Sequence, residues 1–418
     1  MIRPGDLLTL VPEKAAAGGR MLARHDGMVI LVAGAIPGER VTARADRVEK
    51  SLAFATVVEV LEPHPERRAV PFDPRCGGAA LAHISPAWQR RLKADAIADA
   101  LERIGRIRLD GPIHVAPSPE AGYRMRARLR LAAGRLGFLL EGTHEVCDAA
   151  PTMQLLPATG AALAGLAERL AAGGLRSGAD VVVSENRPAD ERACHVELTG
   201  PAGRGAMRAV TPVSGVSGLT WAVAGSAGGR TAYGSPCVED VVCGARLRRH
   251  VCAFFQGNRF LLDELAGAVV SACPAGDVVD LYAGVGLFGA ALAATGMHRV
   301  VAVEGHPASA RDLRANARPF GEAMRVEETR VERFIRRRPA AGAFTLVLDP
   351  PRSGMSPAAA AGAAALGASR AVFVSCDVAT FARDVRRFVD AGYRIESIRA
   401  FDLFPNTPHV ESLAVLAR

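Results

Sequence analysis

The first part of the chain alternates short apolar runs with turn residues. The runs cover residues 6–11, 28–33 and 54–60, and Gly-Gly, Asp-Gly and Pro-Gly steps lie between them. Strand-length apolar runs bounded by such steps are typical of a small all-β module. We therefore predict a β-barrel domain over residues 1–61.

The middle of the chain mixes helical and strand patterns. Apolar residues recur at helical spacing between 86 and 105 and predict an amphipathic helix with Trp88, Leu92, Ile97, Leu101 and Ile104 on or near one face. Residues 110–235 combine short strands, Gly-rich turns and an alanine-rich helix at 159–172, with no sharp internal boundary. We predict a central α+β domain over residues 62–245.

From about residue 246 to 418, strand and helix patterns alternate regularly. Apolar strand-like runs end near residues 282, 304, 349 and 375, and a helical pattern follows each of them. This rhythm is typical of a doubly wound, mostly parallel sheet with helices on both faces. We predict an α/β domain over residues 246–418.

The composition is typical of a soluble globular protein, and the net charge favours anionic partners. The chain has 418 residues, 49% hydrophobic and 22% charged, with a formal net charge of +8. No secretory signal pattern opens it, and the apolar run at 357–368 is shorter than the ~20 residues of a membrane span, so we expect a cytoplasmic protein without a membrane partner. The eight scattered cysteines predict reduced thiols, not a disulfide framework.

A glycine-rich loop indicates a nucleotide-containing cofactor. The segment 280–289 follows an apolar strand and opens a helix, and Glu304 ends the next strand. Glycines allow close approach of the backbone to a ligand, and the acid can accept ribose hydroxyl hydrogen bonds. The loop alone leaves NAD and S-adenosylmethionine open. Asp349-Pro350-Pro351-Arg352 favours S-adenosylmethionine, because a hydride-transfer enzyme has no clear need for a stiff acid-bearing loop, although Pro-Pro could simply terminate a strand.

An arginine stripe lies at residues 123–131. In a strand, Arg124, Arg126, Arg128 and Arg130 would line one face, with apolar residues on the other. For an isolated stripe a solvated sheet face is the better interpretation. Further basic residues between 90 and 108 favour a nucleic-acid track instead.

Cys376 follows a buried strand pattern and precedes a helical one. A free cysteine is usually a small buried hydrophobe. The expected helix N-terminus would lower the pKa of this thiol and favour a reactive thiolate. A second candidate acid, Glu411, ends the segment 405–411.

Taken together, these segments resemble the S-adenosylmethionine-dependent RNA uracil-5-methyltransferases, specifically the TRAM-bearing, 23S rRNA type. The matching segments cover nearly the whole chain: 27–41, 123–128, 254–258, 280–288, 349–352, 375–384 and 404–411. The resemblance implies a class I methyltransferase domain with S-adenosylmethionine as cofactor. It also implies roles for individual residues: cofactor contacts at Gln256, Tyr282, Glu304 and Asp349, a nucleophile at Cys376 and a base at Glu411.

The implied chemistry is the formation of 5-methyluridine in RNA. Thiolate addition to C6 makes C5 nucleophilic, and a carboxylate then removes the C5 proton. The base must leave its stack, so we expect single-stranded or loop RNA, with rRNA favoured over tRNA, bound by a monomer. Two alternatives remain: a methyltransferase acting on another acceptor, which would not need Cys376, and a non-catalytic RNA-binding protein.

One departure from the resemblance concerns an iron–sulfur cluster. Related TRAM-bearing proteins often hold a cluster on four cysteines, but here only Cys76 remains of the first run and Ala150 stands at the fourth position, with Cys147 close by. Such a cluster needs four cysteine ligands. We therefore predict no cluster or other metal, and an apolar repacking around Val70 and Ala79.

Overall fold

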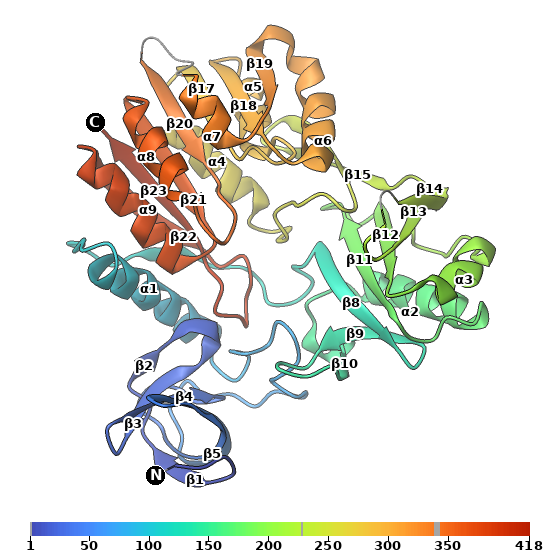
Figure 1. The fold of residues 1–418 in the computed structure, drawn as a ribbon, viewed down its shortest axis with the longest axis vertical. Helices are drawn as coiled ribbons and strands as arrows, with labels where there is room; N and C mark the ends of the chain where they lie inside the picture. The colour runs from blue at the N-terminus through green and yellow to red at the C-terminus, as the bar shows by residue number, and fades with distance from the viewer. Residues whose placement is uncertain (1, 227–228, 338–342) are drawn as a thin grey trace.

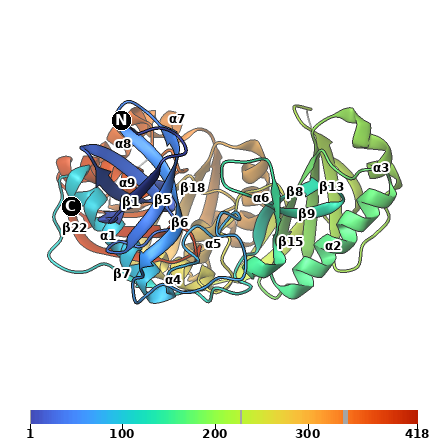
Figure 2. The same cartoon turned by 90° about the horizontal axis from the view of Figure 1, so that it is seen from below.

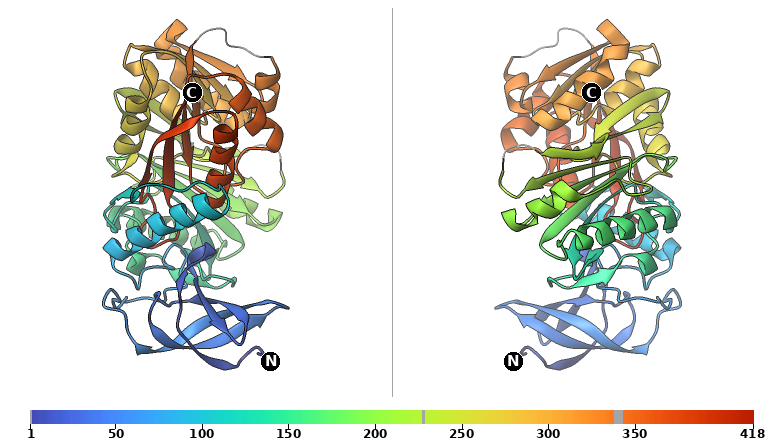
Figure 3. Two further views of the ribbon diagram at one scale, coloured as in Figure 1. Left: turned by 90° about the vertical axis from the view of Figure 1, so that its left-hand side faces the viewer. Right: turned by 90° about the vertical axis from the view of Figure 1, so that its right-hand side faces the viewer.

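A computed structural model describes residues 2–226, 229–337 and 343–418. The N-terminal strands form a separate body at one end of the molecule, and the large C-terminal sheet and a green central domain lie side by side above it (Figures 1 and 3). Seen from below, the N-terminal body covers the C-terminal part of the chain, while the central domain extends to the other side (Figure 2). No helix among the described residues is long and apolar enough to cross a membrane.

The N-terminal body is a curved sheet in the order β1-β5-β6-β4-β3-β2. Its strands are β1 (Leu7–Leu10), β2 (Lys14–Ala15), β3 (Met21–His25), β4 (Met28–Ala33), β5 (Arg40–Val48) and β6 (Leu52–Glu62). Register shifts between β5 and β6 bend the sheet around a core that includes Ile30, Val41 and Ala55. Leu81 and Ile84, from the segment after the strands, and Leu92 farther along the chain also belong to this core.

The predicted helix at 86–105 is α1 (Pro86–Arg103), which begins at the Ser85 cap. Ile97 and Leu101 are buried as expected, but Ile104 is 48% exposed because it follows the last helical residue. Both α1 and β7 (His114–Ala116) pack with the C-terminal domain, since β7 pairs in parallel with that domain's edge strand β22 (Arg394–Phe401). The segment 86–116 therefore belongs to the C-terminal layer and not to the central domain in which the sequence analysis places it.

The central domain is a sheet in the order β10-β9-β8-β11-β12-β13-β14, with α2 and α3 packed against it (Figure 1). Its elements are β8 (Arg126–Ala132), β9 (Arg135–Leu139), β10 (Val146–Asp148), α2 (Pro157–Ala172), β11 (Ala179–Glu185), β12 (Arg192–Leu198), α3 (Arg204–Ala209), β13 (Gly218–Val223) and β14 (Arg230–Gly234). Short 3-10 helices lie at Ala17–Gly19, Ala150–Thr152, Pro201–Gly203 and Arg318–Ala323.

The arginine strand begins later than the predicted 123–131. Residues 123–125 pair with a loop of the C-terminal domain instead, where Met125 N donates to the Gly257 carbonyl at 2.8 Å and Arg259 N donates to the Tyr123 carbonyl at 3.0 Å. The prediction that Arg124 belongs to the strand is therefore wrong. Its backbone forms an isolated bridge with Asn258 and links the two domains.

A hairpin of β15 (Cys237–Val242) and β16 (Ala245–His250) leads into the C-terminal sheet, whose order is β19-β18-β17-β20-β21-β23-β22-β7. Its remaining strands are β17 (Gly276–Leu281), β18 (His298–Glu304), β19 (Met324–Glu328), β20 (Phe344–Leu348), β21 (Arg370–Ser375) and β23 (Glu411–Ala417). The helices are α4 (Leu262–Ala272), α5 (Leu287–Ala294), α6 (Pro307–Ala317), α7 (Val331–Arg336), α8 (Pro357–Ala365) and α9 (Val378–Asp390).

This sheet confirms the predicted doubly wound, mostly parallel α/β domain. One hydrophobic core joins α4, α5 and α6 to one face, and another joins α1, α7, α8 and α9 to the other. The strands from β19 to β21 run parallel, whereas β23 is antiparallel to both of its neighbours. The sequence analysis did not predict this reversal.

A disulfide bond joins Cys76 to Cys147, with a Cα–Cα separation of 5.9 Å. The expectation of reduced thiols is thus wrong for this pair. Ala79 is buried, but Val70 is only half-buried and lies outside the hydrophobic cores of the described residues. The predicted apolar repacking is therefore replaced by a covalent link between the segment after the N-terminal body and β10.

Candidate active site

Most of the predicted site residues lie at the carboxyl ends of the parallel strands. Leu281 at the end of β17 lies opposite Val303 of β18 and Leu348 of β20, so the next residues along are Tyr282, Glu304 and Asp349. Cys376 follows β21 at the same edge. Ligands of open α/β sheets bind at this edge.

Glu411 reaches the same edge from the opposite direction. Ser375 of β21 pairs with Ser412 of the antiparallel β23, and continuing this register sets residue 376 opposite residue 411. Glu411 is 2% exposed, and its Oε1 atom has no hydrogen-bond partner among the described residues. A buried acceptor without a partner is costly unless a ligand or water pairs with it.

The glycine-rich loop is shaped by hydrogen bonds from its backbone. Gly284 N donates to Glu304 Oε2 at 2.8 Å, and His306 N donates to Glu304 Oε1 at 2.5 Å. Gly286 has φ +97°, and a Cβ there would lie 2.7 Å from Leu313 Cδ1, so both conformation and space require glycine. A Cβ at Gly284 would meet nothing within 4 Å, so open space lies in front of this glycine.

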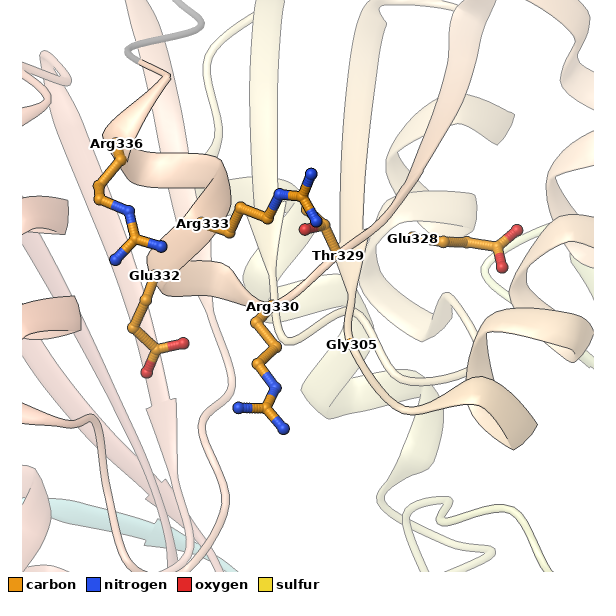
Figure 4. A pocket seen from close by; sticks show the side chains of 7 residues that line it. All are labelled: Gly305, Glu328, Thr329, Arg330, Glu332, Arg333 and Arg336. Atoms are coloured by element: carbon orange, nitrogen blue, oxygen red, sulfur yellow. The ribbon is translucent and has the colours of Figure 1, made fainter.

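A cavity of about 510 Å³ opens next to the Glu304 strand end. It is lined by residues of the β18 end, the β19 end and α7: Gly305, Glu328, Thr329, Arg330, Glu332, Arg333 and Arg336. In Figure 4 the side chains of Arg330 and Glu332 extend to the same side of the α7 segment, while Arg333 reaches over Thr329. The sheet edge therefore offers volume beside Glu304 as well as in front of the glycine loop.

Gln256 joins the site from the loop between β16 and α4. Its side chain is 5% exposed, and a hydrogen bond from it opposes the rise in the pKa of Asp349. The next residue, Gly257, lies against Phe404, whose ring would be 3.4 Å from a Cβ at that position. The structure thus brings Gln256 to Asp349.

Burial makes the acids of the site reluctant to ionise. It raises the pKa of Asp349 to about 7 and that of Asp280, beneath the glycine loop, to about 8. The pKa of Glu411 is raised well above its usual range by burial and by the charge of Asp349, while the Arg352 charge lowers it.

The prediction of a thiol activated by a helix N-terminus is wrong for Cys376. Burial, followed by the charge of Glu411, raises the pKa of this thiol to about 11. The N-terminus of α9 is instead capped by the side chain of Asp377, which accepts from Thr380 N at 2.8 Å. The charge and hydrogen bond of Arg352 act in the other direction and lower the thiol pKa.

The sequence analysis names Arg352 in the stiff loop after Asp349 but gives it no effect on the thiol, and it gives no role to His409. Arg352 is exposed, yet its charge acts on the pKa values of Cys376, Glu411 and His409. Burial, with Arg352 as the next cause, lowers the pKa of His409 to about 4.

The predicted RNA-binding arginines do not form one continuous stripe, and acidic side chains neutralise the charge of two of them. Arg128 pairs with Glu197, and Arg130 pairs with Asp180 on the next strand. The Arg124 guanidinium donates to Gln154 and lies over the Phe138 and Phe404 rings. Arg126 is half-buried, and its Nε atom has no partner in the described part of the chain.

Comparison with known proteins places this geometry in a family. A sequence profile described as tRNA (Uracil-5-)-methyltransferase matches residues 248–418. The 23S rRNA (uracil(1939)-C(5))-methyltransferase RlmD of Alkalilimnicola ehrlichii is 33% identical, over 96% of this chain and 94% of that protein. The chain belongs to the RNA (uracil-5-)-methyltransferase family. The resemblance predicted from the sequence is thereby confirmed.

Further relatives support the same family and fold. A protein of Streptomyces avermitilis named "Uncharacterized RNA methyltransferase" is 33% identical, over 96% of both chains. The Pyrococcus abyssi tRNA (uracil-54, C5)-methyltransferase, solved in complex with S-adenosyl-L-homocysteine, superposes with a TM-score of 0.74 at 23% identity, covering 98% of this chain and 99% of that one. This last similarity shows the fold over the full length.

Proposed function

We propose that this enzyme transfers a methyl group from S-adenosylmethionine to C5 of a uridine in 23S rRNA, through a covalent bond between Cys376 and C6 of the base. The observation that carries the proposal is the register that sets the half-buried Cys376 opposite Glu411, whose Oε1 atom has no partner among the described residues, at the ligand-binding edge of the sheet. The rRNA substrate is favoured by the 33% identical RlmD relative.

The chain offers a fitting place for S-adenosylmethionine, which supplies an electrophilic methyl group on a sulfonium. Open space in front of Gly284 and the cavity next to Glu304 give room along the sheet edge. We assign Glu304 and Tyr282 to the nucleoside part, and Asp349 with Gln256 to the part nearest the thiol. A cation near Asp349 would favour its carboxylate, whose pKa of about 7 leaves it only partly ionised at neutral pH.

The proposed roles of the protein side chains follow from bond balance. The Cys376 thiol gives its proton to solvent, and its sulfur adds to C6, which leaves an enolate at C5 and O4. C5 would then take the methyl group while the bond between that group and the sulfonium sulfur breaks, which leaves a neutral thioether. The Glu411 carboxylate removes the remaining C5 proton, the C5–C6 double bond forms again, and the sulfur leaves as a thiolate. Arg352, whose charge lowers the thiol pKa, supports both the start and the end of this cycle.

RNA contacts are proposed on the face of the central sheet that carries Arg126, Arg128 and Arg130. Arg126 is the best candidate there, because Arg128 and Arg130 already have acidic partners. Arg124 sits between domains and would act mainly by holding the loop near Phe404. We assign a TRAM-like RNA-holding role to the N-terminal body, and we propose a cytoplasmic monomer.

The test is nucleoside mass spectrometry of ribosomal and transfer RNA from a deletion strain. Complementation uses the wild-type gene, Cys376→Ala or Glu411→Gln. Loss of 5-methyluridine from 23S rRNA, restored only by wild type, supports the proposal. Restoration by Cys376→Ala would favour a methyltransferase without covalent addition, loss from tRNA alone would change the substrate, and no loss from any RNA would overturn the proposal.

A further inference from the structure

The loop that leads into the proposed base is held from outside its own domain. It connects β22 to β23 and ends at Glu411. Its central residue, Asn406, has φ +65° and is buried. Gln89 of α1 forms two hydrogen bonds with Asn406: Asn406 N donates to Gln89 Oε1 at 2.8 Å, and Gln89 Nε2 donates to Asn406 Oδ1 at 2.9 Å.

The same loop is fixed at its start by a second residue of α1. Lys93 Nζ donates to Asp402 Oδ1 at 2.5 Å and to the Phe404 carbonyl at 3.1 Å. The Lys93 and Asp402 side chains are 1% and 3% exposed. Because Gln89 and Lys93 are four residues apart, they lie one above the other on the same face of α1.

The segment that joins the N-terminal body to α1 also contacts this loop. Leu81 N donates to the Asn406 carbonyl at 2.8 Å, and Arg68 Nη2 donates to Asn406 Oδ1 at 2.8 Å. Gln89 Nε2 in turn lies 3.0 Å from the Leu81 carbonyl. Gln89 is therefore the point at which α1, the joining segment and the loop meet.

We propose that Gln89 and Lys93 are positioning residues that set Glu411 against the bound base. This inference rests on the proposed function. Both residues are fully buried yet polar, and their bonds to the loop leave them little freedom. A catalytic group must be held within a fraction of an ångström, and a displacement of about 1 Å can cost about 100-fold in rate. Loss of Gln89 would leave Asn406 N without its acceptor and remove both hydrogen bonds between Gln89 and the loop.

The inference predicts which step slows. Glu411 acts only after the methyl group has been transferred, so a displaced loop should delay removal of the C5 proton while RNA binding and adduct formation persist. The RNA–protein adduct would then accumulate. A residue that only stabilises the fold would lower the amount of active enzyme, without changing the lifetime of the adduct in the folded fraction.

The experiment uses 23S rRNA transcribed with [5-³H]uridine and the full-length enzyme in a single turnover. Tritium release reports proton removal, and denaturing gels report the adduct. We expect Gln89→Met to slow tritium release by about 10- to 100-fold with RNA affinity unchanged and more adduct present. Gln89→Glu retains the acceptor for Asn406 N but loses the Nε2 donor to Leu81, Ile84 and Asn406, so it should recover only the part of the rate that depends on the Asn406 N bond.

The matched control is Ile97→Ala on the same helix, which removes a buried side chain of the C-terminal core. It should lower stability and leave adduct lifetime unchanged. The proposal is overturned if Gln89→Met and Gln89→Glu release tritium at the wild-type rate, or if Ile97→Ala extends the adduct equally. Absence of tritium release from wild-type enzyme would instead refute the proposed function.

Discussion

The resting state of Cys376 gives the most direct test of the site's electrostatics. Its thiol pKa is about 11, against about 9 for an unperturbed thiol. At pH 8 the thiolate fraction should therefore be about one in a thousand, compared with about one in ten without the shift. Alkylation of Cys376 by iodoacetamide at pH 8 should be about 100-fold slower than that of the unfolded chain.

Two substitutions should move this pKa in opposite directions. Glu411→Gln removes a carboxyl group whose charge, once ionised, disfavours the thiolate, so alkylation of Cys376 should become faster in the part of the pH range where wild-type Glu411 is ionised. Arg352→Met removes a charge and hydrogen bond that favour the thiolate, so alkylation should become slower. Burial, the largest cause of the shift, is retained in both variants.

The assay follows the Cys376 peptide by mass spectrometry between pH 7 and 11. The exposed Cys252, far from Cys376 in sequence, serves as an internal reference. The Cys376→Ala variant identifies the peptide that carries Cys376. A wild-type midpoint at or below about pH 8.5 would refute the reasoning. So would slower alkylation in Glu411→Gln. The expected result means that the free enzyme protects its thiol and ionises it only once ligands change its surroundings.

Three further outcomes follow from other contacts. Lys93→Met should destabilise the protein to urea by about 3–5 kcal/mol because Asp402 is left buried without its partner, and Lys93→Met combined with Asp402→Leu should regain most of this loss. Reduction of the Cys76–Cys147 disulfide should destabilise the protein by about 4 kcal/mol, because the bond closes a loop between cysteines 71 residues apart in the chain. Mass spectrometry and melting temperatures measured with increasing reductant would show no change if the two thiols are already free. Arg126→Ala should reduce the magnitude of the slope of log affinity for RNA against log salt by about 0.7–0.9, and an unchanged slope would mean that it does not contact a phosphate.

The sheet edge could be predicted because each site motif follows a strand. Tyr282, Glu304, Asp349 and Cys376 come directly after apolar runs, and the carboxyl ends of parallel strands share one edge. Local pattern is sufficient for such residues. Glu411 differs because it begins a strand, and its place opposite Cys376 depends on a strand reversal that no local pattern announces.

The features that sequence reasoning missed depend on contacts between distant segments. Cys76 meets Cys147 across 71 residues, and Arg124 leaves its strand because Asn258 pairs with its backbone. The thiol pKa reflects burial, which a strand pattern does not measure. One signal in the sequence indicated the contacts of α1: Gln89 and Lys93 interrupt its apolar face at a spacing of four residues. Polar side chains on a buried face usually have buried polar partners.

The reversed strand explains how one sheet edge can hold both the proposed nucleophile and the proposed base. In an entirely parallel sheet, the strand beside β21 would begin at the far edge, and its first residue would lie a strand length away from Cys376. Because β23 runs antiparallel, its first residue, Glu411, faces the residue after the last of β21. The cost is a loop, residues 402–410, that must return across the edge outside the strand pairs of the sheet. Residues of α1, Gln89 and Lys93, constrain this loop, which is why a helix before the central domain packs on the C-terminal sheet.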